Sequence, residues 1–283
     1  MKYKKVVVIG SNTIAVECVR ILFKEYRIED LAVIENNEDN NLSMLKYICV
    51  KKDIYYQCAK DKADMDDLLM KLDSLEQMLI ISANNNYIFK KETIDKHTII
   101  NFHYSYLPDY RGRNIPSWVI YNQEPYTGVT WHFVNSCIDD GSIIRQEKFE
   151  LLPDDRAFDV VKRGMKLGVE LFKQFIGDLL DGKMIETKAN KGEQVRTYLS
   201  KSIPDSGVLN LESDGRQIYA TLRAFDYNNI SIFPGLLVEW KGKRYIVKGY
   251  SAKQGNISKI DKIYKEGNKL IIEKKSWLIQ IEL

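Results

Sequence analysis

The stretch VVVIGSNTIAVECVRILFKEYRIEDLAVI, residues 6–34, reads as a strand, a turn, a helix and a second strand. Val6–Ile9 and Leu31–Ile34 are short, continuous apolar runs of the kind that form buried strands. Ile14–Tyr26 places apolar residues at helical spacing, and Gly10–Thr13 is typical of a turn. Elements in this order predict two parallel strands joined by a crossover helix.

The same alternation continues as far as residue 82. It predicts an α/β fold with a Rossmann-like parallel sheet and helices on both faces. The turn at Gly10 lacks the G-x-G-x-x-G pattern, so the topology does not by itself indicate a dinucleotide. The elements expected after residue 34 are helices at 43–51 and 62–74 and strands at 54–57 and 78–82.

Two domains are expected. Residues 1–200 would form the first, closed by a long amphipathic helix at 154–181. Residues 201–283 would form a small β-rich domain, because segments of strand composition alternate there with Lys-Gly and Glu-Gly-Asn turns. An open barrel or a small sheet fits this pattern, with a short helix at 214–225.

The cysteines and the apolar segments exclude several classes of protein. Cys18, Cys49, Cys58 and Cys137 form no C-x-x-C pair, and no histidine lies at metal-ligand spacing, so neither a metal site nor a disulfide framework is indicated. No segment reaches the roughly 18 uninterrupted apolar residues of a membrane span. The first apolar run is too short for a signal peptide. A cytoplasmic protein that does not contact the membrane is therefore expected.

Three polar residues mark a candidate site within residues 101–141. Asn101 and His103 follow an apolar run and, being two apart at a strand end, project to the same face. Asp139 follows a second expected strand, 128–134, on an Asp-Asp-Gly turn. An amide, an imidazole and a carboxylate fit an acyl-transfer site that holds a reacting carbonyl. Taken singly, the asparagine also fits a cap at a strand end, the histidine a structural side chain and the aspartate a turn.

The chain has two other histidines. His97 is expected to cap the end of a lysine-rich helix. His132 alternates with Thr130 and Val134 on the strand 128–134, and a structural role is expected for it.

Four short motifs resemble the folate-dependent formyltransferases in their order and spacing. They are N-x-H at Asn101–His103, S-x-L-P-x-x-R-G at Ser105–Gly112, G-V-T at Gly128–Thr130 and D-x-G at Asp139–Gly141. That family includes methionyl-tRNA formyltransferase, glycinamide ribonucleotide formyltransferase and the nucleotide-sugar N-formyltransferases. The resemblance implies that Asn101, His103 and Asp139 are the catalytic residues.

The resemblance also implies a reaction, in which 10-formyltetrahydrofolate gives its formyl group to an amine through a tetrahedral intermediate, without a metal. Asn101 would donate a hydrogen bond to the negative oxygen, and one such donor is worth about 3 kcal/mol of barrier. His103 would manage the proton, because imidazole titrates near neutral pH. Whether it starts neutral or charged is open. Asp139 would orient the imidazole or relay protons through water.

The folate head would bind at the carboxyl edge of the sheet, where open parallel sheets place their ligands. By the resemblance, the loop after the strand 78–82 would lie on one side of the pterin and residues 134–139 on the other. The residues expected to contact the folate are Ser82, Ala83, Asn84, Ile88, Val134, Ile138 and Asp140.

The acceptor is expected to be the amine of a dTDP- or UDP-linked amino deoxysugar, made for a surface polysaccharide such as the lipopolysaccharide O-antigen. Residues 221–227 resemble a segment of enzymes that act on amino sugars. Arg223 would reach a diphosphate, and Phe225 or Tyr227 would stack on a base. Arg223 fits equally well as one half of an Arg–Asp pair that pins the helix. Arg111 would face an anionic ligand or bind internally.

Two alternatives remain open. A methionyl-tRNA formyltransferase is one, because residues 241–283 carry eleven Lys and Arg against four Asp and Glu, and a basic unit suits tRNA phosphates. Against nucleic acid, the segment 35–41 is acidic where the tRNA enzymes carry a basic loop. The other is a non-catalytic folate- or nucleotide-binding protein. A homodimer is expected from the resemblance to sugar formyltransferases.

Overall fold

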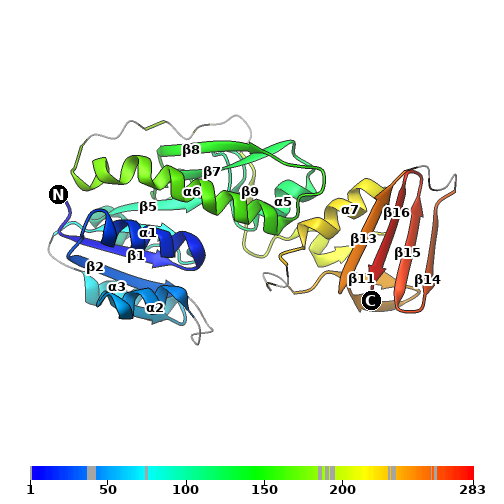
Figure 1. Cartoon of the computed structure of the whole chain (residues 1–283), viewed down its shortest axis with the longest axis horizontal. Helices are drawn as coiled ribbons and strands as arrows, with labels where there is room; N and C mark the ends of the chain where they lie inside the picture. The colour runs from blue at the N-terminus through cyan, green and yellow to red at the C-terminus, as the bar shows by residue number, and fades with distance from the viewer. Residues whose placement is uncertain are drawn as a thin grey trace. The chain divides into compact units, whose positions relative to one another are not determined.

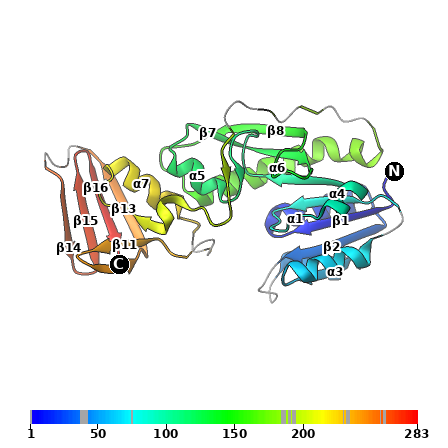
Figure 2. The same ribbon diagram turned by 180° about the vertical axis from the view of Figure 1, so that it is seen from behind.

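The computed structural model describes residues 2–36, 43–73, 76–183, 187–188, 191, 195–228, 230, 234–255, 257 and 260–283. It divides into two compact units, whose elements can be followed in Figure 1 and Figure 2. The first unit comprises Met1–Arg111, Gly128–Lys148 and Arg163–Arg196, and the second comprises Gly112–Thr127, Phe149–Lys162 and Thr197–Leu283. Each unit is therefore assembled from segments that are far apart in the sequence. The division into domains at residues 1–200 and 201–283 stays a prediction.

The first unit is built on a seven-stranded sheet with the strand order β3-β2-β1-β4-β5-β7-β8. The four pairs from β3 to β5 are parallel, as the alternating pattern predicts. The pair β5–β7 is antiparallel, an arrangement that needs no crossover helix on the sheet. The strands are β1 (Lys5–Gly10), β2 (Asp30–Asn36), β3 (Tyr55–Ala59), β4 (Leu79–Ala83), β5 (Thr98–His103), β7 (Tyr126–Phe133) and β8 (Ile143–Glu150).

Side-chain caps explain where two of the helices begin. Ser43 accepts a hydrogen bond from the backbone N–H of Lys46 at the start of α2, and Asp61 accepts one from Asp64 at the start of α3. For α3, the expected last residue, 74, lies outside the described residues. The helices are α1 (Asn12–Lys24), α2 (Met44–Lys51), α3 (Lys62–Leu72), α4 (Lys91–Lys96) and α6 (Ala157–Leu180).

Apolar side chains cover both faces of this sheet. On one face, Ile80 and Ile99 pack in a buried cluster with Met65 and Leu69 of α3. Trp131 of β7 is fully buried, contacts the rings of Phe172 and Phe175, and donates its indole N–H to the carbonyl of Gly168 at 2.8 Å. Helix α6 therefore fixes the strand that later supplies part of the site.

Gly10 is required by a close backbone approach. Its φ is 154°, and a Cβ atom built on it would lie 1.8 Å from the carbonyl oxygen of Ala83. The next residue, Ser11, donates its backbone N–H to that same oxygen at 3.2 Å. The glycine thus serves the contact between the ends of β1 and β4.

The second unit is rich in β-strands, as expected. Its described strands form a three-stranded sheet, β10-β11-β12, and a four-stranded sheet, β13-β16-β15-β14, while β6 pairs with β9. The core contains Ile218 and Leu222 of α7 together with Val238, Ile272 and Ile279. The elements are β6 (Arg111–Gly112), α5 (Ile115–Tyr121), β9 (Thr197–Tyr198), the 3-10 turn η2 (Pro204–Gly207), β10 (Val208–Leu209), α7 (Gly215–Ala224), β11 (Leu237–Trp240), β12 (Lys243–Ile246), β13 (Gly249–Gln254), β14 (Lys262–Glu266), β15 (Lys269–Lys274) and β16 (Trp277–Glu282).

Among the helices of the described residues, none combines the length and the apolarity needed to cross a bilayer.

Candidate active site

Three neighbouring strands bring three polar residues into one row across the first sheet. The register places Ser82 beside Asn101 in the parallel pair β4–β5, and Asn101 opposite His132 in the antiparallel pair β5–β7. Residues paired in this way point to the same face of a sheet. The preceding row contains Ile80 and Ile99 of the apolar cluster. The face therefore turns polar at the carboxyl ends of β4 and β5, where ligands bind in open α/β sheets.

Hydrogen bonds run along this row. Ser82 accepts from Asn85 Nδ2 at 3.2 Å and donates its hydroxyl to Asn101 Oδ1 at 2.7 Å. Asn101 Nδ2 lies 3.2 Å from His132 Nε2, and His132 Nδ1 lies 2.8 Å from the carbonyl oxygen of Phe133. A carbonyl oxygen only accepts, so His132 carries hydrogen on Nδ1 and accepts from Asn101 at Nε2. Within the described part of the chain, no residue accepts the second hydrogen of Asn101 Nδ2.

His103 stands at the end of β5 and is 6% exposed. Its Nε2 donates to the carbonyl oxygen of Tyr110 at 2.8 Å. The loop that carries this carbonyl is held by the hydroxyl of Ser105, which donates to the carbonyl of Asp109 at 2.7 Å. Because Nε2 is engaged, Nδ1 is the ring nitrogen that His103 has available for proton transfer.

Asp139 lies between the two imidazoles. Its Oδ2 is 3.5 Å from His103 Nδ1, and its Oδ1 is 3.4 Å from His132 Nε2. These distances exceed the roughly 2.7–3.2 Å of a good N–H···O bond, so neither contact is a hydrogen bond in this structure. The structure therefore places Asn101, His103 and Asp139 together, as the sequence motifs predict.

The turn after Asp139 needs glycine for a specific reason. A Cβ atom on Gly141 would lie 1.7 Å from the carbonyl oxygen of Phe133, the atom to which His132 donates. Asp139 itself has φ 46°, in the left-handed region that Asp tolerates better than most residues. The D-x-G turn and the orientation of His132 thus depend on the same carbonyl group.

His132 is the site residue that sequence reasoning missed. A structural role was expected for it because it alternates with Thr130 and Val134, but the structure places it against both Asn101 and Asp139. The signal lies in the register of β5 with β7, which pairs Asn101 with His132. That register depends on an antiparallel pairing that the βα alternation does not predict.

The inner residues expected to contact folate form hydrogen bonds with other residues of the chain. Ser82 is 2% exposed. The carbonyl of Ala83 accepts from the backbone N–H of Ser11, and Asn84 Nδ2 donates to Ser11 Oγ at 3.0 Å. Asn84 and Ser11 thus join the loops after β4 and β1. Contact of these residues with folate stays a prediction.

The outer residues of that set differ in exposure. Ile88 is 71% exposed and Ile138 is 47% exposed, so both apolar side chains face solvent. Val134 packs against the apolar cluster and donates its backbone N–H to the carbonyl of Ile99. Asp140 Oδ1 lies 2.6 Å from Arg111 Nη1, an ion pair that joins strand β6 to the turn after β7.

The remaining residues expected to bind the acceptor lie in the second unit, and each contacts other residues of that unit. Arg223 is 8% exposed and donates to the carbonyl of Asp155 at 2.6 Å, and burial lowers the pKa of its guanidinium. The Tyr227 hydroxyl lies 2.8 Å from Ser117 Oγ, and burial raises the pKa of Tyr227 to about 12. Phe225 packs against the core cluster of this unit.

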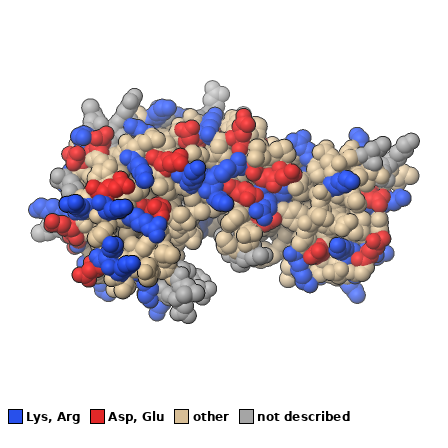
Figure 3. Space-filling view, viewed as in Figure 1, with Lys and Arg blue, Asp and Glu red and all other residues tan. Residues whose placement is uncertain are grey.

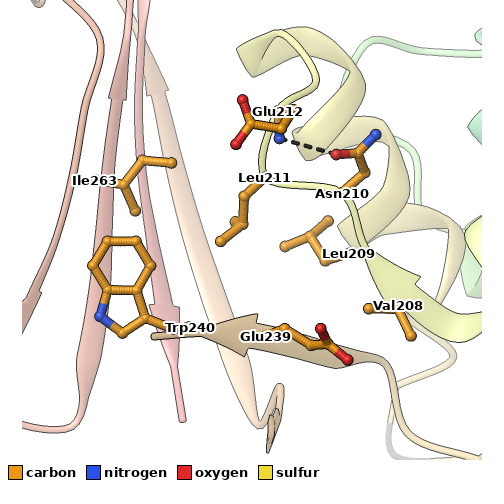
Figure 4. A pocket seen from close by; sticks show the side chains of 8 residues that line it. All are labelled: Val208, Leu209, Asn210, Leu211, Glu212, Glu239, Trp240 and Ile263. Atoms are coloured by element: carbon orange, nitrogen blue, oxygen red, sulfur yellow. Dashed lines mark hydrogen bonds between the residues drawn. The ribbon is translucent and has the colours of Figure 1, made fainter. Parts of the chain in front are cut away.

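Two hollows lie away from these residues. One, of ≈ 440 Å³, opens in the second unit between Leu211, Trp240 and Ile263, with carboxylates at its rim (Figure 4). The other, of ≈ 450 Å³, lies in the first unit beside Asn12 and Glu35. Neither is lined by the residues of the row described above. Over the described residues, no group of His, Cys, Asp and Glu side chains has the arrangement of a metal site.

Residues 4–176 match the protein family described as formyl transferase. Among curated relatives, methionyl-tRNA formyltransferase of Thermodesulfovibrio yellowstonii is 31% identical over 59% of this chain and 54% of its own length. The chain thus spans about half of that relative. GDP-perosamine N-formyltransferase of Brucella melitensis is 27% identical over 86% of this chain and 92% of its own length.

Two solved structures share the fold over nearly the whole chain. WlaRD, a sugar 3N-formyl transferase crystallised in the presence of dTDP and 5-N-formyl-THF, has a TM-score of 0.76, with 23% identity, over 100% of this chain and 98% of that one. The N-formyltransferase from Helicobacter canadensis, in complex with folinic acid and dTDP-3-aminofucose, has a TM-score of 0.77, with 23% identity, over 98% of each chain.

Proposed function

Because the chain belongs to the formyl transferase family, to which more than half of its residues match, we propose that it moves a formyl group from 10-formyltetrahydrofolate to the amine of a nucleotide-linked amino deoxysugar. The observation that carries this proposal is the convergence of Asn101, His103 and Asp139 at the carboxyl ends of the parallel strands. These side chains supply a hydrogen-bond donor, a proton acceptor and a carboxylate in one place.

The geometry suggests how these groups would act. The acceptor amine attacks the formyl carbon, a C–N bond forms, and the formyl oxygen becomes negative. The second N–H of Asn101 Nδ2 would donate to that oxygen, which stabilises it by about 3 kcal/mol. His103 Nδ1 would take the proton lost by the amine, directly or through water, with Asp139 beside it. Cleavage of the bond to N10 of the folate returns a proton to that nitrogen and releases tetrahydrofolate. No step as written needs a metal ion.

Relatives support a sugar acceptor. The Brucella protein named for GDP-perosamine matches along nearly its whole length. Of the two solved structures named above, one was determined in the presence of dTDP and the other in complex with dTDP-3-aminofucose. The nucleotide in this chain's substrate is therefore to be sought among dTDP, UDP and GDP. A homodimer in the cytoplasm, acting in the synthesis of a surface polysaccharide such as the O-antigen, is part of the same proposal.

Methionyl-tRNA is the second candidate acceptor, because several curated relatives carry that name. The charge pattern on one face of the molecule does not favour it. On the face shown in Figure 3, Lys and Arg side chains are interspersed with Asp and Glu rather than gathered in one basic surface. Residues 37–41, most of the acidic segment 35–41 that argues against tRNA, lie outside the described residues.

Mass spectrometry of the products tests the proposal. Purified protein is incubated with 10-formyltetrahydrofolate and with amino sugars linked to dTDP, UDP or GDP, and in a separate reaction with methionyl-tRNA. We expect at least one nucleotide sugar to gain a formyl group. Formylation of methionyl-tRNA alone would reject the sugar acceptor. No transfer to any amine by folded protein that binds 5-formyltetrahydrofolate would favour a non-catalytic binding protein instead.

A further inference from the structure

The row Ser82–Asn101–His132 fixes a direction as well as a position. Asn101 has a carbonyl oxygen at one end of its amide and an NH2 group at the other, and only the NH2 group can stabilise a negative oxygen. Ser82 donates to the carbonyl end at 2.7 Å. The NH2 end therefore points to His132, which accepts because its Nδ1 hydrogen is used on Phe133.

The reverse orientation of the amide would leave polar groups unsatisfied. Asn101 Nδ2 would then face Ser82 Oγ, which already accepts from Asn85 Nδ2, and the hydroxyl hydrogen of Ser82 would lose its acceptor. The Asn101 oxygen would face His132 Nε2, which carries no hydrogen in the neutral ring that donates to Phe133 through Nδ1. Ser82 is 2% exposed and Asn101 is part-buried, so water replaces these bonds poorly and the reverse orientation is disfavoured.

We propose that Ser82 is a positioning residue for formyl transfer, whose hydroxyl orients the Asn101 amide so that its NH2 group, and not its oxygen, serves the oxyanion. This inference rests on the proposed function for its catalytic consequence. Its structural part, the direction of the hydrogen bonds, stands independently of any substrate.

The three histidines make that direction measurable. His97 accepts from the backbone N–H of Met78 at Nδ1, and His103 donates to a carbonyl through Nε2. In the neutral ring, both therefore carry hydrogen on Nε2. His132 alone among the three, all of which are described, carries it on Nδ1. Asp139 Oδ1, 3.4 Å from His132 Nε2, is the charged group that would favour the other form.

The experiment combines nitrogen NMR of the histidine rings with kinetics of the full chain. In the wild type, the His132 signals should show a protonated Nδ1 and an unprotonated Nε2. In Ser82→Ala, the Asn101 oxygen loses its hydrogen-bond donor, so part of the population should turn this oxygen toward Nε2 and hydrogen should appear on Nε2, at the expense of the Nδ1–H bond to Phe133. The kcat should fall by as much as roughly a hundredfold, the effect of losing the donor, while KM for the acceptor stays the same.

Ser105→Ala is the matched control, since Ser105 is also buried and its hydroxyl also donates to an oxygen, the carbonyl of Asp109. Its His132 signals should match the wild type. A protonated Nε2 in wild-type His132 would overturn the inference even if Ser82→Ala does not fold. Unchanged His132 signals, or an unchanged kcat, in folded Ser82→Ala would also overturn it. Absence of transfer by the wild type, with the expected His132 signals, would instead count against the proposed function.

Discussion

His103 donates its Nε2 hydrogen to the carbonyl oxygen of Tyr110 at 2.8 Å, and this bond decides which nitrogen of the ring faces the site. The opposite nitrogen, Nδ1, lies 3.5 Å from Asp139 Oδ2. A ring held at Nε2 cannot rotate to exchange its nitrogens without losing a buried hydrogen bond, which costs about 1–3 kcal/mol. In the proposed mechanism, His103 therefore accepts the proton at one atom, Nδ1.

Replacing His103 by Ala should remove turnover and spare folate binding. The variant lacks the imidazole that is proposed to accept the amine proton, and the loss of a general base typically lowers kcat by roughly 10²–10⁴-fold. Calorimetric titration of His103→Ala with 5-formyltetrahydrofolate should give an affinity close to that of the wild type. Turnover retained in His103→Ala would remove this residue from the mechanism, whereas lost folate binding would show a structural effect.

Asn101→Ala and Asn101→Asp should form a graded pair. Alanine removes the donor and should lower kcat about a hundredfold. Aspartate has nearly the shape of asparagine but places a negative charge where the oxyanion forms, so its kcat should be lower than that of the alanine variant. Steady-state kinetics with saturating donor separates the two. Equal activity of both variants would mean that the side chain at this position does not face the developing charge.

Gly141→Ala should damage stability and activity together. Its Cβ atom would lie 1.7 Å from the Phe133 carbonyl oxygen, and that oxygen holds His132. Overpacking of this kind costs about 1–3 kcal/mol, and moving the carbonyl shifts both Asp139 and His132. Thermal unfolding and kcat measure the two effects. Gly255→Ala is the control, because the nearest side-chain atom to its Cβ, on Ile257, is 3.9 Å away.

Local patterns were sufficient to predict the parallel part of the sheet. The apolar runs that became β1, β2 and β4 are continuous and flanked by helical periodicity, so the chain itself contains the signal. Asn101 and His103 were found in the same way, since residues two apart at a strand end share a face. The position of Asp139 came from the D-x-G motif and not from a periodicity.

Pairing between distant strands was not predictable. His132 joins the site because β7 runs antiparallel to β5 with Asn101 opposite His132, and a shift of one residue would have turned its ring to the other face. The bonds of Arg223 to Asp155 and of Tyr227 to Ser117 likewise depend on tertiary packing. No spacing along the chain encodes these contacts.

His97 should make the stability of the protein sensitive to acid. Burial lowers its pKa; its Nδ1 accepts from the Met78 N–H, and its Nε2 lies 3.0 Å from Asp73. A histidine whose pKa is lower in the folded state contributes its full stability above its unfolded value, about 6.5, and loses it as the pH falls toward the folded value. His97→Gln should therefore be destabilised at about pH 7.5 by roughly 1–2 kcal/mol. Because glutamine takes up no proton in this range, the difference in free energy of unfolding between the wild type and the variant should narrow toward about pH 5. Urea unfolding between about pH 5 and pH 7.5 measures this difference. A difference that stays constant or widens toward acid would contradict the lowered pKa of His97.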